Sequence, residues 1–122
     1  IMKEINPTGK LHISFVQEGM TDEKTIAPSI QLAVFRIIQE QLTNIIKHSG
    51  ATQAALKLIQ DNKTLQLEIR DNGSGFDIHN TPKGLGLHNI FTRAELCSGK
   101  AMLETKPGKG CLLKIILPVE VE

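Results

Sequence analysis

The stretch from Ser29 to Ser49, SIQLAVFRIIQEQLTNIIKHS, constrains the fold most, because it has the periodicity of one long helix. At about 100° per residue, its apolar side chains gather into a stripe that is wide enough to be buried. Pro28 before the stretch and Gly50 after it predict where the helix begins and ends. We expect the apolar stripe to face the core; it consists of Val34, Phe35, Ile38, Leu42, Ile45 and Ile46.

Polar side chains gather on another side of the same helix, at spacings of i, i+4, i+7 and i+8. They are Glu40, Asn44, Lys47 and His48. An amide oxygen suits Mg²⁺, a lysine offers a point charge for phosphate, and a carboxylate one turn away can orient water or act as a base. A solvated helix face has the same spacing, but the adjoining Ala33 and Ile37 favour the wall of a cleft.

Length, charge and cysteine usage limit the class of protein. A chain of 122 residues fits one domain, and a net charge of +1 gives no electrostatic case for nucleic acid or an anionic membrane. Cys97 and Cys111 lack zinc-site spacing, so a reducing cytoplasmic compartment is the expectation. No apolar run approaches the roughly 18 residues of a membrane span. We expect a single domain over residues 1–122, cut from a longer protein, with residues 1–10 poorly structured.

Apolar and polar residues alternate in several short segments, which predict strands. The first covers residues 11–17, and residues 52–60 and 64–70 form a hairpin. A second helix is expected over residues 87–97, followed by a hairpin of residues 100–105 and 111–117. This order predicts a two-layer α/β sandwich, in which helices cover one face of a mixed, mostly antiparallel sheet.

A glycine-containing loop, Asp71-Asn-Gly-Ser-Gly-Phe76, follows the second strand of the first hairpin directly. A plain turn explains Asp-Asn-Gly, but it does not explain the second glycine, Gly75, or the apolar Phe76. Glycines let a flat ring approach the backbone, and Asp71 can accept a hydrogen bond from an exocyclic amine. A purine would satisfy both features.

A second glycine loop, Gly84-Leu85-Gly86-Leu87, opens the second helix. Unpaired N–H groups at a helix N-terminus attract phosphate oxygens, glycines admit them, and Lys83 adds positive charge just ahead. The Walker pattern and the dinucleotide fingerprint are both absent. The loop therefore predicts a phosphate site of another class.

Three segments in this order resemble the sequence boxes of the Bergerat-fold (GHKL) ATPases. RIIQEQLTNIIKHS looks like the N box, DNGSGF like the first glycine box, and GLGLHNI like the second. The resemblance covers roughly Pro28 to Pro118 and is greatest to the catalytic domains of nitrate-sensor-type two-component sensor histidine kinases. It implies the Bergerat fold, with ATP and Mg²⁺ as the bound groups.

The resemblance also implies a role for each matching residue. Glu40 would be the catalytic carboxylate, Asn44 the Mg²⁺ ligand, and Lys47 and His48 would approach the phosphates. Asp71 would bind the adenine amine. The remaining nucleotide-binding residues would be Gly73 and Gly75 at the purine, with Lys83, Gly84, Leu85, Gly86 and Leu87 at the triphosphate.

The implied reaction passes the γ-phosphoryl group of ATP to a histidine on a dimerisation domain that this chain lacks, and then indirectly to a response regulator. The isolated chain is expected to bind ATP with little turnover. The sequence departs from the family pattern in a short lid, residues 77–83, and in Cys111, which stands where a threonine is usual. Two alternatives stay open: an anti-sigma-factor-type serine kinase, and a non-catalytic interaction module with the same fold.

Overall fold

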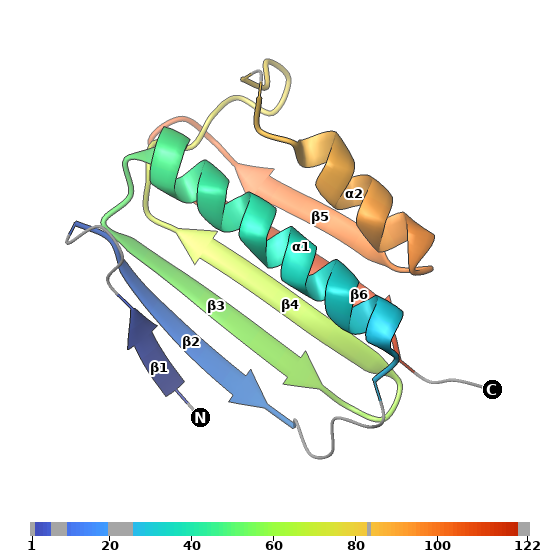
Figure 1. Cartoon of the computed structure of the whole chain (residues 1–122). Coiled ribbons are helices and arrows are strands. Elements are labelled where there is room, and N and C mark those ends of the chain that lie inside the picture. The colour runs from blue at the N-terminus through green and yellow to red at the C-terminus, as the bar shows by residue number, and fades with distance from the viewer. Residues whose placement is uncertain (1, 6–9, 20–25, 83, 120–122) are drawn as a thin grey trace.

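The computed structural model describes residues 2–5, 10–19, 26–82 and 84–119, which form a six-stranded sheet with helices on one face (Figure 1). The strand order is β1-β2-β3-β4-β6-β5. The strands are β1 (Met2–Ile5), β2 (His12–Glu18), β3 (Gln53–Gln60), β4 (Thr64–Asp71), β5 (Lys100–Thr105) and β6 (Cys111–Pro118). The helices are α1 (Pro28–Asn44), continued by the π-helical turn η2 (Ile45–Ser49), and α2 (Leu87–Leu96).

The sheet is mixed and mostly antiparallel, so the predicted two-layer α/β sandwich is confirmed. Strands β2 and β3 pair in parallel because α1 carries the chain back across the sheet between them. The predicted hairpins are β3–β4 and β5–β6, and they meet through an antiparallel β4–β6 pair. The expectation that residues 1–10 lack structure is wrong for Met2–Ile5, which pair antiparallel with β2 and extend the sheet at its edge.

The long helix ends where the sequence predicts, but its last turn is widened. Residues Ile45–Ser49 form a π-helical turn, and Gly50 closes it with a left-handed φ of 66°. A π turn has i→i+5 hydrogen bonds, so a helical wheel of 3.6 residues per turn no longer gives side-chain directions beyond Asn44. Lys47 and His48 lie within this turn.

The buried face of α1 differs from the predicted stripe. Val34 and Ile45 are buried as expected, but Phe35 is 57% exposed and Ile46 is 45% exposed. Ile37, which is fully buried, lies at the centre of the real inner face, a rotation of about 100° around the helix axis. Apolar residues occupy most of the circumference of α1, so the position of its neighbour α2 and of the pocket decides which side is covered. The inner face consists of Ala33, Val34, Ile37, Gln41, Asn44 and Ile45.

The core lies between the two helices and the central strands of the sheet. Its fully buried side chains come mainly from β4, β6 and the inner faces of the helices; they include Ile37, Leu67, Ile69, Ile90, Leu113 and Ile115. In the part of the chain that the structure describes, no helix is both long enough and apolar enough to cross a membrane.

Candidate functional site: a pocket at the C-terminal end of helix α1

A pocket opens where the C-terminal end of α1, the end of β4 and the start of α2 converge. It encloses about 460 Å³, counting the open space at its mouth. Six of the residues singled out in the sequence line it: Asn44, His48, Asp71, Gly75, Leu85 and Leu87. The two glycine loops and the long helix, which are far apart in sequence, therefore meet at one hollow.

Asn44 is buried, with 7% of its surface exposed, and its side-chain amide is anchored twice. The Nδ2 atom donates to the carbonyl oxygen of Leu85 at 2.6 Å and to Oε1 of Gln41 at 3.2 Å. Both N–H groups are thus used, while the structure gives Oδ1 no hydrogen-bond partner within its described residues. Oδ1 is the atom left to face a ligand.

Asp71 lies at the end of β4 and is 5% exposed. Its Oδ1 accepts a hydrogen bond from the backbone N–H of Gly73 at 2.8 Å, and Oδ2 has no such partner among the described residues. Burial raises the pKa of this carboxyl above its usual range, against the lowering effect of the Gly73 hydrogen bond. A buried carboxylate with one free oxygen is a strong acceptor for a donor that enters the pocket.

The loop after Asp71 is held on two sides by backbone contacts. The N–H of Ser74 donates to the carbonyl of Ser49 at the end of the π turn, at 2.8 Å. A Cβ on Gly73 would lie 2.6 Å from the Ser49 side chain, so Gly73 packs against the helix end and does not line the pocket. Gly75 has φ +61° and lies against the carbonyls of Lys106 and Gly110 in the β5–β6 hairpin. Of the two predicted purine-loop glycines, the structure brings Gly75 to the pocket.

The second glycine loop places the N-terminus of α2 at the rim of the pocket. Gly86 is the N-cap of α2, with a left-handed φ of 64°, and a Cβ there would lie 2.7–2.9 Å from the carboxyl atoms of Glu40. Gly84 has φ +84°, but a Cβ there would meet nothing within 4 Å. The absence of a side chain at Gly86 therefore lets Glu40 lie directly against the start of α2.

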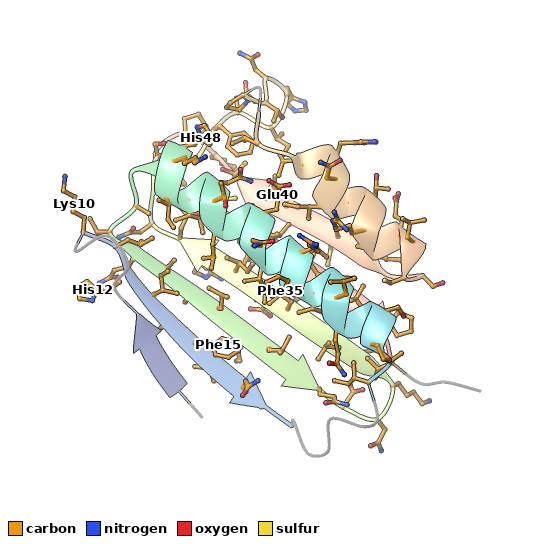
Figure 2. All side chains as sticks on the ribbon, viewed as in Figure 1. Lys10, His12, Phe15, Phe35, Glu40 and His48 are labelled. Atoms are coloured by element: carbon orange, nitrogen blue, oxygen red, sulfur yellow. The ribbon has the colours of Figure 1, made fainter. Side chains whose placement is uncertain are left out.

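Glu40 lies outside the pocket, on the side of α1 that faces α2 (Figure 2). It lines a shallow hollow on the outer surface together with Arg36, Thr43 and Arg93. His48 lies at the far end of the same helix, close to the loop that follows β4 (Figure 2). Lys47, which belongs to the π turn, is exposed and does not line the pocket. Lys83 lies outside the described residues.

Gln41, which the sequence reasoning did not place in the site, lines the pocket, and so does Cys111, which the sequence reasoning noted only as a departure from the usual threonine. The Gln41 Nε2 atom is 3.9 Å from Cys111 Sγ. Burial and the nearby Asp71 carboxylate raise the pKa of the Cys111 thiol to about 11, so it is neutral at ordinary pH. Its spacing is a signal that could have identified Gln41: it lies three residues before Asn44, and residues three apart share one face of a helix.

The pocket offers one protein oxygen as a ligand for a divalent cation, and substrate phosphates and water would have to supply the other ligands. Within the described residues there is no group of three or more His, Cys, Asp or Glu that could hold a metal ion. Asn44 instead offers a single hard oxygen with no hydrogen-bond partner. Mg²⁺ is commonly bound in this way, through one or two protein oxygens together with substrate phosphates and water.

Comparison with known proteins gives the class. The profile of the histidine kinase-, DNA gyrase B-, and HSP90-like ATPase family matches residues 29–121. The chain belongs to this family. The match spans all three sequence boxes and every described element of the pocket.

Two relatives that the chain resembles in sequence are both histidine kinases. The chain is 32% identical over 117 residues to the signal transduction histidine-protein kinase/phosphatase DegS of Bacillus subtilis, covering 93% of this chain and 30% of DegS. It is 36% identical over 115 residues to an uncharacterized sensor-like histidine kinase of Chloroflexus aurantiacus, covering 88% of this chain and 19% of that protein. The chain therefore spans less than a third of the length of these curated relatives.

Solved structures share the fold. The histidine kinase domain of the blue-light activated histidine kinase of Erythrobacter litoralis superposes with a TM-score of 0.67 at 16% identity, over 91% of this chain and 52% of that one. The ATP-binding domain of PrrB from Mycobacterium tuberculosis gives a TM-score of 0.57 at 29% identity, over 71% of this chain and 67% of that one.

Proposed function

We propose that this chain is the ATP-binding catalytic domain of a sensor histidine kinase. It would transfer the γ-phosphoryl group of Mg-ATP to a histidine on a dimerisation domain outside this chain. The observation that carries the proposal is the convergence on one pocket of the Asn44 oxygen, the Asp71 carboxylate and the N-terminus of α2. The relatives, which are histidine kinases, favour this proposal over a serine kinase or an interaction module.

Each part of the pocket has a chemical task in this proposal. The free oxygen of Asp71 accepts a hydrogen bond from the adenine amine, beside the apolar side of the pocket formed by Ile45, Phe76 and Leu87. Backbone N–H groups at the start of α2 hold phosphate oxygens. Mg²⁺, bound through Asn44 Oδ1, would supply positive charge to the phosphates. His48, at the mouth, adds a further polar contact to them.

In this proposal, Glu40 acts on the histidine that attacks the γ-phosphorus. In the transfer, an imidazole nitrogen forms a bond to phosphorus, the bond from phosphorus to the bridging oxygen of ADP breaks, and the imidazole loses its remaining proton. A carboxylate beside the start of α2 can orient this imidazole and accept that proton. The surface hollow that Glu40 lines is outside the pocket and open to a partner domain, which supports this role.

Glu40→Gln should separate binding from transfer. The variant should bind Mg-ADP with an affinity within about threefold of wild type, because Glu40 does not line the pocket, yet lose phosphotransfer by about 100-fold or more. The assay would supply a histidine-containing dimerisation domain from a homologous kinase in trans, with a serine-kinase substrate protein in a parallel arm. Transfer to the serine protein alone, or undiminished transfer by the variant, would contradict the proposal.

We also propose that the domain works in the cytoplasm. Both cysteines, Cys97 and Cys111, are free thiols. Unpaired thiols are typical of proteins in a reducing compartment, and this supports the proposal.

A further inference from the structure

Gln41 is a buried amide for which the proposed phosphoryl transfer has no task. It lies on α1, three residues before Asn44, and is 3% exposed. Burying an amide is costly unless its polar atoms are hydrogen-bonded. Both of its polar atoms have partners in the pocket wall, namely Asn44 on one side and Cys111 on the other.

Chemistry fixes the orientation of the two amides. The carbonyl oxygen of Leu85, 2.6 Å from the Asn44 amide, can only accept, so the Asn44 atom that faces it is Nδ2. The second hydrogen on Nδ2 then needs an acceptor, and Oε1 of Gln41 provides it at 3.2 Å. Gln41 consequently turns Nε2 toward Cys111 Sγ. The chain of contacts runs from Leu85 through Asn44 and Gln41 to Cys111.

We propose that Gln41 is a positioning residue that holds the Asn44 amide with its oxygen toward the cation, and that it thereby sets how strongly Mg²⁺ strengthens nucleotide binding. This inference rests on the proposed function. An Asn44 amide turned by 180° would present N–H donors to the cation and would break the hydrogen bonds to Leu85 and Gln41 together. Gln41 therefore penalises the orientation that cannot bind metal.

The same contacts connect the metal end of the pocket to its purine end. Cys111 lies close enough to Asp71 for that carboxylate to raise the thiol pKa. Cys111 also pairs with Asp71 across β4 and β6. A purine that bonds to Asp71 would thus lie beside the Cys111 thiol. That thiol contacts the Gln41 amide, which orients Asn44.

The test is the ratio of ADP affinities measured by titration calorimetry with Mg²⁺ and with EDTA. Gln41→Leu keeps the approximate volume but removes the acceptor, and should lower this ratio about tenfold while the affinity in EDTA stays within about twofold. Gln41→Glu keeps an oxygen toward Asn44 and should retain most of the wild-type ratio. Gln66→Leu, the same change on β4 away from the pocket, is the matched control and should retain all of it.

A second measurement does not depend on the stability of a variant. In ¹⁵N-labelled wild type without nucleotide, both side-chain amide protons of Asn44 should exchange with solvent more slowly than those of the exposed Asn62, since both are hydrogen-bonded.

Fast exchange of these two protons, or an unchanged Mg²⁺ ratio in Gln41→Leu, would overturn the inference about Gln41 and leave the proposed function standing. No ADP binding by wild type with or without Mg²⁺ would overturn both.

Discussion

The ionised side chain of Asp71 should lower the folding stability of the nucleotide-free domain, and a substitution can measure this effect. Because burial raises its pKa above the ordinary 3.8, the ionised side chain is less favourable in the folded protein than in the unfolded chain. Its contribution to stability is therefore most favourable at acidic pH, below the unfolded pKa, and is lost as pH rises through the folded pKa.

Asp71→Asn should stabilise the nucleotide-free domain at pH 7, and this gain should shrink as pH falls through the raised pKa of the folded protein and be lost below the ordinary value of 3.8, where the wild-type side chain is neutral in both states. The same variant should weaken adenine nucleotide binding by about 10- to 100-fold, because a charged acceptor is lost. Urea unfolding across pH and ADP calorimetry measure the two effects. A variant less stable than wild type at pH 7 would contradict the account of the buried charge.

At the residue scale, pocket residues could be predicted where a residue type has a distinctive chemistry and a local context. Asn44 and Asp71 were identified in this way, and both are at the pocket. Gln41 was missed although it lies three residues from Asn44 on the same helix, because its other partner, Cys111, comes from a strand 70 residues away in the chain. The family resemblance predicted Lys47 at the phosphates, whereas the structure shows Lys47 exposed in the π turn and outside the lining of the pocket.

The orientation of α1 can be tested by truncating one side chain on each candidate face. Ile37→Ala should destabilise the domain by about 2–5 kcal/mol, because Ile37 is fully buried in the core. Phe35→Ala removes a larger group but should cost less than about 1 kcal/mol, because Phe35 is 57% exposed. Chemical denaturation of both variants gives the comparison. The reverse order would show that the stripe predicted from the sequence is the buried one.

The contact between Gly86 and Glu40 predicts how substitutions at the start of α2 change the stability of the domain. Gly84→Ala and Gly86→Ala both force a left-handed backbone on alanine, at a cost of about 1–2 kcal/mol each. Gly86→Ala should cost more, because its Cβ would collide with the Glu40 carboxyl group, whereas Gly84 has open space.

The matched control is a double-mutant cycle. Adding Glu40→Ala should recover the extra cost of Gly86→Ala and have no such effect on Gly84→Ala. Thermal or urea unfolding of the nucleotide-free variants measures both couplings. Equal costs for the two glycine substitutions would mean that Glu40 does not rest against the start of α2.

At the element scale, the ends of helices and hairpins could be read from the chain, but the buried face of α1 could not. Gly50 and the Asp61-Asn62-Lys63 turn act locally, so the helix end and the β3–β4 hairpin follow from them. The buried side of α1 depends on what packs against it. Apolar residues on most of its circumference allow several orientations, and the Asn44 contact with Leu85 helps to select the one observed.

At the scale of the whole molecule, the sequence predicts the order of elements and the two-layer arrangement, while the long-range pairings need the structure. The antiparallel β4–β6 pair joins residues such as Asp71 and Cys111, which have no local relation. The β1–β2 pair was missed because residues 1–10 show no clear alternation. The pocket forms from these pairings, since β4 and β6 bring Asp71 and Cys111 to the end of α1.

Calorimetric unfolding with ADP or ATP, each with and without Mg²⁺, tests the central claim of a Mg²⁺-dependent nucleotide site most directly. The chain has no Trp or Tyr, so intrinsic fluorescence would not report binding. Nucleotide at about 100 times its Kd should add about 2.7 kcal/mol, which raises Tm by about 10 °C for a domain of this size. We expect this rise in wild type with Mg²⁺ and its loss in Asn44→Ala. An unchanged Tm at millimolar nucleotide, or an undiminished Mg²⁺ effect in Asn44→Ala, would contradict the proposed nucleotide site.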